Sequence, residues 1–248
     1  MVLVLDDITF GYSARTPVFS GFGLVADASA TVLLGPNGAG KSTLLGLAAS
    51  QLSPARGSVS FGGARPDRRG LAAYRRRVAW IPQQITPVPG LTVREQVAYA
   101  GWLKGMDRRA AWEASGRALE RVGLADLAGR RSNRLSGGQL RRTGIAGALC
   151  HSSELILMDE PTAGLDPVQR RVFRELVAEL SRTVQVVVST HQTEDLADLY
   201  DRVVVLDRGA VRFRGSPAEF HALAPDGTSG SGRERAEAAY GRLVGREV

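Results

Sequence analysis

The eight residues from Gly35 to Ser42, GPNGAGKS, are the part of the sequence best suited to chemistry. Glycines let the backbone curl so that successive N–H groups point inward at an anion. Lys41 brings a full positive charge to such an anion, and the Ser42 hydroxyl is a suitable ligand for Mg²⁺. A helix that starts near Lys41 adds unpaired N–H groups and the positive end of its dipole. The pattern therefore indicates a loop that holds phosphate groups.

The residues on either side of this loop have the pattern of a strand and a helix. Residues 30–34 (ATVLL) are apolar and partly β-branched, as in a buried strand, and residues 43–49 (TLLGLAA) have helical spacing. A strand, a glycine turn and a helix in this order favour a phosphate site over the alternative, an ordinary glycine turn before a helix. We therefore predict a nucleoside triphosphate site. Its predicted nucleotide contacts are Gly35, Pro36, Asn37, Gly38, Ala39, Gly40, Lys41, Ser42 and Thr43.

Residues 155–161 (LILMDEP) form a second apolar stretch that ends in two carboxylates, Asp159 and Glu160. If residues 155–158 form a strand, Asp159 lies at its carboxyl end, where it can approach a Mg²⁺ ion held by Ser42. Glu160 can then act as the base for a water molecule in line with the γ-phosphate. Acidic residues often end strands for structural reasons alone. The phosphate loop earlier in the chain favours the catalytic interpretation.

Length and composition fit one α/β domain with room for an inserted subdomain. The chain has 248 residues, 44% of them hydrophobic, and no apolar run reaches the roughly 18 residues needed to cross a bilayer. The first residues lack the basic start of a signal peptide, so we expect a soluble, cytoplasmic protein. The one cysteine, Cys150, lies in an apolar stretch, which indicates a buried core residue and excludes a disulfide framework.

The net charge of +7 requires nucleic acid to be considered as a partner. The basic residues are nearly all arginines in short, scattered groups, and no aromatic residues alternate with them to form a stacking platform. We interpret them as a solvated basic surface and expect no specific nucleic-acid partner. A mild preference for anionic lipid head groups is a secondary expectation.

The periodicity of apolar residues predicts an α/β core interrupted by helices. Strands are expected at residues 2–10, 57–61, 78–82, 154–158, 184–189 and 202–206. Helices are expected at residues 93–104, 110–122, 139–149 and 168–181. We place the main domain at residues 1–220, with a helical subdomain at about 88–150. Residues 221–248 form a predicted C-terminal extension, with a flexible linker at 226–232 and a charged helix at 233–246.

A third motif, LSGGQ at residues 135–139, points to a known family. Its serine hydroxyl and glycine N–H groups can bind an anion at the start of a helix, and the alternative is an ordinary helix with Ser136 as its N-cap. Together with the phosphate loop and the Asp–Glu pair, this motif resembles those of the ATP-binding cassette (ABC) ATPases. The resemblance covers about residues 2–220. It implies a P-loop NTPase core with an N-terminal antiparallel β subdomain and an inserted helical subdomain that carries LSGGQ.

The resemblance also implies roles for single residues. Tyr12 looks like the aromatic residue that stacks on adenine, although alone it reads as an exposed tyrosine after a strand. Gln83 resembles a glutamine that touches Mg²⁺, but the adjacent Gln84 leaves that assignment open by one position. Asp166 resembles the aspartate of a loop at the dimer interface, and His191 the histidine that contacts the γ-phosphate. The implied catalytic residues are Lys41, Glu160 and His191, and the metal ligands Ser42, Gln83 and Asp159; further nucleotide contacts are Tyr12, Gln83, Asp166 and, from a second subunit, Ser136, Gly137, Gly138 and Gln139.

Such a family implies ATP and Mg²⁺ as cofactors and two kinds of partner. A second ABC ATPase subunit would sandwich two nucleotides with this one, as a homodimer or a heterodimer. A separate transmembrane permease would carry the spans, which places the chain on the inner face of the cell membrane. The proline-rich segment 85–91 resembles one that borders the groove for a short permease helix; its alternative is a rigid loop packed on its own domain.

The run from Leu91 to Gly105 looks most like the cassettes of bacterial ABC-2 type exporters, and we therefore expect an ATPase subunit of an exporter. An importer subunit is the first alternative. A soluble ABC ATPase acting on nucleic acid or ribosomes is the second, but such relatives usually carry two cassettes or long inserts, which this chain lacks. A regulatory module without turnover is disfavoured by the presence of Glu160 and His191.

Overall fold

The computed structural model describes residues 1–248 except 14, 194–198, 226–227, 229–230 and 245–248. Its strands are β1 (Leu3–Phe10), β2 (Phe19–Ala26), β3 (Ala30–Leu34), β4 (Arg56–Phe61), β5 (Val78–Ile81), β6 (Leu155–Asp159), β7 (Gln185–Thr190), β8 (Arg202–Asp207) and β9 (Ala210–Gly215). Its α-helices are α1 (Lys41–Ala48), α2 (Leu71–Arg77), α3 (Val93–Leu103), α4 (Arg108–Arg121), α5 (Gly137–Cys150), α6 (Pro167–Leu180), α7 (Pro217–His221) and α8 (Gly232–Val244). Short 3₁₀ helices lie at Ala125–Leu127 and Ser132–Arg134.

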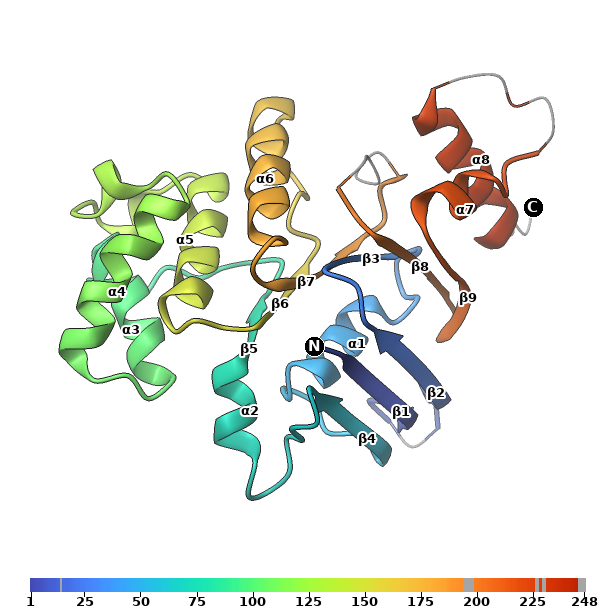
Figure 1. Ribbon diagram of the computed structural model, residues 1–248, viewed down its shortest axis with the longest axis horizontal. Coiled ribbons are helices and arrows are strands. Elements are labelled where there is room, and N and C mark those ends of the chain that lie inside the picture. Colours follow the sequence, from blue (N-terminus) through green and yellow to red (C-terminus); the bar gives the residue numbers. More distant parts are fainter. Residues whose placement is uncertain (14, 194–198, 226–227, 229–230, 245–248) are drawn as a thin grey trace.

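Two sheets form the body of the molecule (Figure 1). The larger has the strand order β5-β6-β7-β3-β8-β9, in which only β9 runs antiparallel to its neighbour. The smaller is antiparallel, with β1 between β2 and β4. Strand β3, which precedes the phosphate loop, lies near the middle of the larger sheet. The predicted fold class, a P-loop core with an N-terminal antiparallel sheet and inserted helices, is confirmed.

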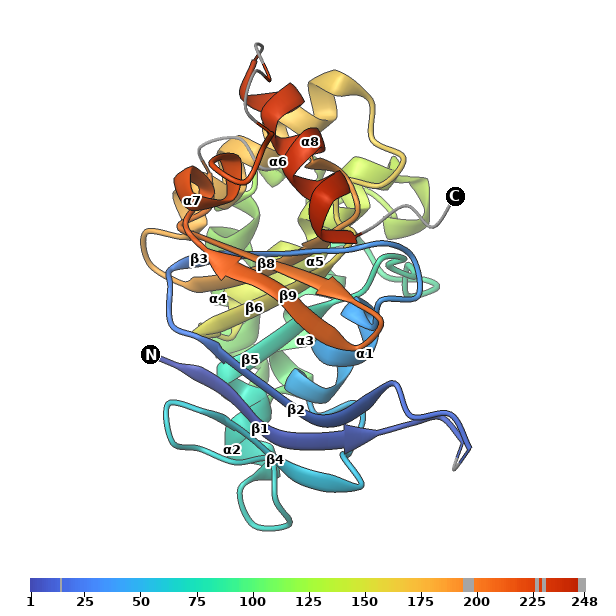
Figure 2. The same cartoon turned by 90° about the vertical axis from the view of Figure 1, so that its right-hand side faces the viewer.

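Helix α1 lies between the two sheets, as Figure 2 shows. Its Leu44, Leu45 and Leu47 are packed into one hydrophobic cluster with residues from both sheets. Side chains of β6 alternate between the two faces of the large sheet, with Leu155 and Leu157 toward α1. Both faces of the parallel strands are therefore buried, which explains why their sequences are apolar throughout rather than alternating.

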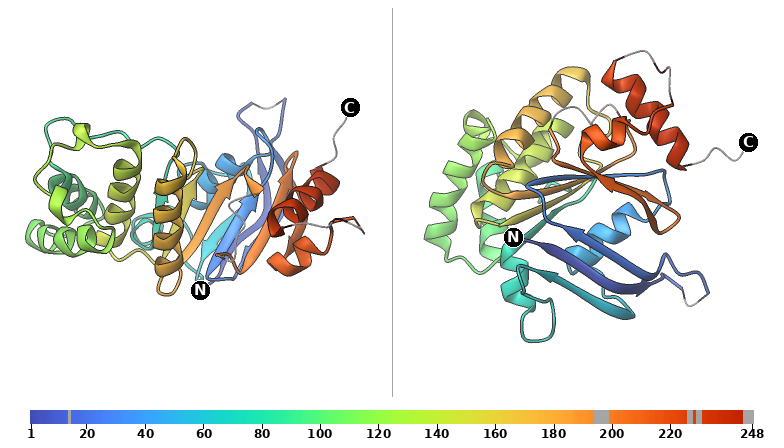
Figure 3. Two further views of the ribbon diagram at one scale, coloured as in Figure 1. Left: turned by 90° about the horizontal axis from the view of Figure 1, so that it is seen from above. Right: turned by 45° about the vertical axis from the view of Figure 1, so that its right-hand side comes forward.

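The opposite face of the large sheet is covered by α6, α7 and α8. Phe173, Leu176 and Val177 of α6 and Phe220 of α7 share a cluster with the strands. Helices α3, α4 and α5 pack together at one end of the molecule, and α7 and α8 lie at the other (Figure 3, left). LSGGQ therefore starts a helix that belongs to the inserted helical part, as predicted.

Helix starts follow the sequence signals for capping. The Thr92 and Ser136 hydroxyls each accept from the backbone N–H three residues on, and the side-chain oxygens of Glu95 and Gln139 accept from the backbone N–H of Thr92 and Ser136. Asp166 caps α6, with Pro167 as the first helical residue. These side chains satisfy backbone groups that a helix leaves unpaired.

Besides the short 3₁₀ helices, two described strands and two described α-helices were not predicted from the sequence. Glycines at positions 21 and 23 interrupt the apolar pattern of β2, although alternate side chains such as Phe22 and Leu24 are buried against the core. Strand β9 is an edge strand with three charged or glycine positions. Helices α2 and α7 are only 7 and 5 residues long, too short for a helical period to be recognised.

The C-terminal extension is packed on the core. Ala236 and Ala239 of α8 are buried, and α8 contacts β8 and β9. The predicted boundary after residue 220 falls inside α7, and the division into a main domain and an extension stays a prediction. Residues 226, 227, 229 and 230 of the predicted linker, and 245 and 246 of the predicted helix, lie outside the described residues; α8 starts at Gly232, within the range predicted as linker.

None of the described helices combines the length and the hydropathy needed to pass through a bilayer.

Tyr74 offers a test of the packing of α2 against α1. Its side chain is fully buried, and its hydroxyl donates to the carbonyl oxygen of Ala48 at 2.5 Å. We expect Tyr74→Phe to lower the free energy of unfolding by about 1 kcal/mol, because a buried acceptor loses its donor. Urea titration at pH 7 would measure the loss, with Tyr99→Phe, at an exposed site, as the control.

The same variant should change the response to alkaline pH. Burial raises the pKa of Tyr74 above its ordinary value of about 10, so the folded state keeps a proton that the unfolded state loses above that pH. The contribution of Tyr74 to the free energy of unfolding is fully present below pH 10. Above that pH it falls by up to about 1.4 kcal/mol per pH unit. The difference in unfolding free energy between the wild type and Tyr74→Phe should therefore shrink above pH 10. A difference that stays constant with pH would contradict a raised pKa of Tyr74.

Candidate functional site

The phosphate loop connects β3 to α1. Gly38 and Gly40 have φ angles of 82° and 103°, a region that glycine adopts without strain. A β-carbon on Gly35 would lie 2.3 Å from the carbonyl oxygen of Leu206, so only glycine fits there. The N-cap of α1 is Gly40, which has no side chain to bond the first N–H groups of the helix. Those donors are therefore directed at the loop, where an anion can accept from them.

Lys41 is buried inside this loop. Its ammonium donates to the carbonyl oxygens of Gly35 at 2.7 Å and Pro36 at 3.2 Å. The same group lies 3.4 Å from a carboxylate oxygen of Glu160, with both side chains almost fully buried. These contacts hold the Lys41 ammonium inside the phosphate loop, beside the carboxylate of Glu160.

The Asp–Glu pair ends β6 and is tied to the end of β7. Asp159 pairs in register with Ser189. The Ser189 hydroxyl donates to Asp159 Oδ1 at 2.6 Å and accepts from the backbone N–H of Glu160 at 3.0 Å. Glu160 has a positive φ of 45°, which is uncommon for a residue other than glycine. The serine therefore links two neighbouring carboxylate residues and supports the unusual backbone turn between them.

His191 completes the group of charged side chains. Its Nδ1 donates to Glu160 Oε2 at 2.8 Å, so Glu160 is held between a histidine on one oxygen and Lys41 on the other. The histidine side chain is 43% exposed, whereas that of Glu160 is 11% exposed. The histidine is therefore the solvent-accessible member of the pair, and the carboxylate lies behind it.

A cleft of about 460 Å³ brings most of the predicted residues together. Its walls come from five separate segments of the chain, four of which follow the carboxyl ends of β3, β5, β6 and β7. Gln83 lines this cleft, and Gln84 is not among its lining residues. The lining residues are Tyr12, Val18, Pro36, Asn37, Gly38, Gly40, Lys41, Ser42, Thr43, Gln83, Glu160 and His191.

The LSGGQ motif and Asp166 lie outside this cleft. Ser136, Gly138 and Gln139 line a separate hollow of about 140 Å³ against Leu165 and α6. A β-carbon on Gly138 would lie 2.7 Å from the amide oxygen of Gln169. Gly137 has open space around it instead. The chain therefore separates its phosphate loop from its second predicted anion-binding motif.

Family comparison agrees with this arrangement. The ABC transporter family matches residues 24–163, more than half of the chain. The chain belongs to the ABC transporter family. It is an ATP-binding cassette, and its family members are the ATPases that power transport.

Two relatives and one solved structure show the extent of the similarity. The cassette is 40% identical over 206 residues to the phosphonates import ATP-binding protein PhnC of Thiobacillus denitrificans, over 79% of this chain and 80% of that protein. It is 36% identical over 187 residues to the ABC transporter ATP-binding protein YxlF of Bacillus subtilis, over 75% of this chain and 61% of YxlF. The chain thus spans about three fifths of the length of YxlF. The dimeric structure of the bacterial ABC transporter cassette MJ0796 matches with a TM-score of 0.77 and 27% identity, over 86% of this chain and 98% of that one.

Tyr12 has the exposure that a stacking role needs. The side chain is 71% exposed at the mouth of the cleft. Its hydroxyl lies 3.2 Å from the hydroxyl of Thr43, and its ring packs edge-on against Phe10. One face of the ring is thereby oriented, and a planar base could stack on the cassette at this position.

Ser189 is the residue of the candidate site that the sequence pattern did not identify. It appeared there only as part of the strand end before His191. A small polar residue at the end of a fully buried strand, two positions before a catalytic candidate, was the available signal. Its partners are Asp159 at the end of β6 and Glu160 just after it, and only the pairing of β6 with β7 identifies them.

The donors present fit a Mg²⁺ ion. The Ser42 hydroxyl is exposed in the cleft, and Gln83 contributes an amide oxygen there. Asp159 uses Oδ1 to accept from Ser189, which leaves its other oxygen for a cation. Hydroxyl, amide and carboxylate oxygens are hard ligands of the kind that Mg²⁺ prefers, with phosphate oxygens and water completing its shell. Among the described residues, no group of three or more histidine, cysteine or acidic side chains forms a metal cluster.

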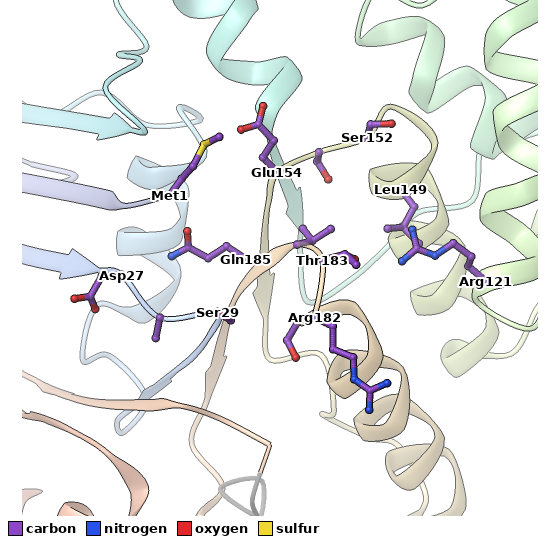
Figure 4. Close-up of a pocket in the computed structure, with 14 residues that line it drawn as sticks. Met1, Asp27, Ser29, Arg121, Leu149, Ser152, Glu154, Arg182, Thr183 and Gln185 are labelled. Carbon is purple, nitrogen blue, oxygen red and sulfur yellow. The ribbon is translucent and has the colours of Figure 1, made fainter.

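A second hollow, of about 490 Å³, lies at the opposite ends of the same strands (Figure 4). Ser29, Glu154 and Gln185 stand there at the amino ends of β3, β6 and β7, and Arg121 and Arg182 flank it. None of the predicted site residues lines it. The phosphate loop, Glu160 and His191 line the cleft at the other edge of the sheet instead.

Ser189→Ala tests whether the serine positions the carboxylates. We expect a loss of about 1–3 kcal/mol in unfolding free energy, because Asp159 Oδ1 loses a buried donor. We also expect kcat for ATP hydrolysis to fall at least about tenfold, with KM within about threefold, since the change acts through the orientation of Glu160.

The matched control is Ser153→Ala. Ser153 is also buried, and its hydroxyl donates to the carbonyl oxygen of Ala148 at 3.0 Å, away from the cleft. This variant should lose a similar amount of stability and keep its kcat. An equal fall of kcat in both variants would show that Ser189 acts on stability alone.

Proposed function

We propose that this chain is the ATP-hydrolysing subunit of a membrane transporter, acting through ATP-dependent closure of a dimer. The observation that carries the proposal is the arrangement of Lys41, Glu160 and His191 in one cleft, with LSGGQ outside it. A second subunit would supply its own LSGGQ to this cleft. The similarity to the dimeric cassette MJ0796 supports this association.

In the proposed mechanism, the loop N–H groups and Lys41 hold the β- and γ-phosphates of ATP. Tyr12 stacks on the adenine. Ser42, Gln83 and Asp159 would hold Mg²⁺, which supplies charge neutralisation on the phosphates when bound. Ser136 and Gly138 of the second subunit, with the adjoining Gly137 and Gln139, contact the γ-phosphate from the other side, beside Asp166 at the interface.

The oxygen of a water molecule then attacks the γ-phosphorus, and Glu160 accepts the proton that this water loses. The bond to the bridging oxygen breaks, and ADP leaves with the electron pair. His191 orients Glu160 through its hydrogen bond and lies beside the γ-phosphate. Loss of the γ-phosphate removes the bridge between the subunits, so the dimer opens.

Two observations bear on the direction of transport, and they favour different directions. The run from Leu91 to Gly105 resembles ABC-2 type exporters, and we propose export on that basis. The similarity to the phosphonates import protein PhnC favours import as the second candidate. In both cases the permease is a separate chain, and the subunit works at the cytoplasmic face of the membrane.

Glu160→Gln is expected to keep ATP binding, to reduce turnover to below about 1% of wild type, and to accumulate an ATP-dependent dimer. The amide cannot accept a proton from water, whereas its size and its hydrogen bonds are similar. Phosphate release assays and size-exclusion chromatography would measure both effects. Lys41→Ala should instead lose ATP affinity and form no such dimer. Turnover near the wild-type rate in Glu160→Gln would remove Glu160 from the role of base.

The transporter assignment is tested by affinity purification of Glu160→Gln from detergent-solubilised membranes with ATP present. We expect a polytopic membrane protein to co-purify, and its identity would distinguish exporter from importer. Recovery of ribosomes or DNA without a membrane protein would contradict the proposal and favour a soluble ABC ATPase.

A further inference from the structure

The turn that follows Glu160 is held in place by hydrogen bonds from two directions. Residues 161–164 form this turn, between β6 and α6. The backbone N–H of Ala163 donates to the carbonyl oxygen of Glu160 at 3.1 Å. The carbonyl oxygen of Ala163 accepts from Nη2 of Arg141 at 2.5 Å. Ala163 therefore connects the backbone of the proposed base to a side chain of another element.

Arg141 belongs to the helix that the LSGGQ motif begins. It is the fifth residue of α5, and Ser136 is the N-cap of that helix. Helices α5 and α6 are both labelled in Figure 1. The start of α5 packs closely on the start of α6, because a β-carbon on Gly138 would lie 2.7 Å from the amide oxygen of Gln169 and 3.5 Å from Leu165. The hydrogen bond of Arg141 adds a polar contact to this packing.

The position of the Arg141 side chain is unfavourable for folding. Burial lowers the pKa of its guanidinium below the ordinary value of arginine. Its Nη1 is buried and has no hydrogen-bond partner among the described residues, and none of the acidic side chains described forms an ion pair with it. A partly buried cation without a counter-charge costs free energy that an apolar side chain of similar length would avoid. Packing alone therefore does not explain an arginine here.

The adjacent arginine has different partners. Nη1 of Arg142 donates to the carbonyl oxygens of Val122 at 3.0 Å and Gly123 at 3.2 Å, where α4 ends. Those partners lie in the same inserted helical part as α5. Of the two arginines, only Arg141 reaches from this part to the segment that follows β6.

The backbone of Glu160 needs this kind of support. Its φ angle of 45° is uncommon outside glycine, and such a conformation persists only where its surroundings hold it. The hydroxyl of Ser189 accepts from the N–H of Glu160, and the N–H of Ala163 donates to its carbonyl oxygen. Arg141 holds the residue that makes the second of these contacts.

We propose that Arg141 is a positioning residue for ATP hydrolysis, which holds the turn 161–164 against α5 and thereby keeps the carboxylate of Glu160 in its reactive orientation. Arg141 is not among the residues that line the nucleotide cleft, so it acts through Ala163 and Glu160 rather than on ATP. The inference rests on the proposed function and adds to it a residue that orients the proposed base.

Arg141→Met tests this role, because methionine fills similar space without an N–H donor. We expect kcat for ATP hydrolysis to fall at least about tenfold, since a displacement of about 1 Å is enough for such a loss. The Kd for ATP should stay within about threefold, because the phosphate loop is unchanged. Arg141→Lys keeps a charged donor on a long side chain and should restore kcat to at least about threefold above that of Arg141→Met. Phosphate release and titration with a fluorescent ATP analogue measure these values.

Arg94→Met is the matched control. Arg94 is also a half-buried arginine, and it donates to the carbonyl oxygen of Trp112 at 3.1 Å and packs over the ring of the same residue. Its partners lie within the inserted helical part, so this variant should lower the midpoint of urea unfolding and keep the wild-type kcat. A wild-type kcat in Arg141→Met, or an equal loss of kcat in both variants, would overturn the proposal. A rise in the Kd for ATP as large as the fall in kcat would overturn it as well, because Arg141 would then act on nucleotide binding.

Glu160→Gln, measured in parallel, separates this inference from the proposed function. If Glu160→Gln loses turnover while Arg141→Met hydrolyses ATP at the wild-type rate, the proposed function stands and the positioning role of Arg141 is rejected. If Glu160→Gln itself turns over near the wild-type rate, the proposed mechanism fails at its base, whatever Arg141→Met does. Loss of turnover in Glu160→Gln together with the reduced kcat of Arg141→Met supports both.

Discussion

The register of three parallel strands is the constraint on which the site depends. Leu34 of β3 pairs with Thr190 of β7, and Asp159 of β6 pairs with Ser189. Because all three strands run in the same direction, the residues that follow them meet at one edge of the sheet. A slip of one residue would turn every side chain to the other face and would separate Asp159 from Ser189. The phosphate loop, the carboxylates and the histidine are therefore adjacent for the same reason that the core is packed.

The buried charges at this edge of the sheet require well-placed polar partners. Lys41 and Glu160 are each almost fully buried, and an isolated charge there would be strongly unfavourable. Each is satisfied by more than one partner: backbone carbonyls and a carboxylate for the lysine, and the lysine and a histidine for the glutamate. Loop and strand ends are thus held together by polar contacts that also orient the reactive groups. Stability and proposed catalysis share the same atoms.

Other surfaces of the molecule have separate tasks in the proposed function. The LSGGQ helix belongs to the inserted helical part, away from the phosphate loop of its own chain. A groove of about 920 Å³ lies between that helical part and α2, and Arg68, Arg69, Arg75, Arg76 and Lys104 are among the residues that line it. The sequence suggested a generally basic, solvated surface, whereas the structure gathers five of those cations around one groove.

The sequence by itself determined the features that depend on neighbouring residues. Glycine spacing, capping residues and apolar runs predicted the loop, most helices and most strands, because backbone conformation and helix ends are governed within a few residues. Strand β2 was not predicted because glycines interrupt its apolar pattern, and α2 and α7 were not predicted because they are too short to show a helical period. Only the tertiary structure placed Ser189 between Asp159 and Glu160, put Gln83 rather than Gln84 in the cleft, and separated LSGGQ from it. Those facts depend on pairings between residues far apart in the chain, which local periodicity does not encode.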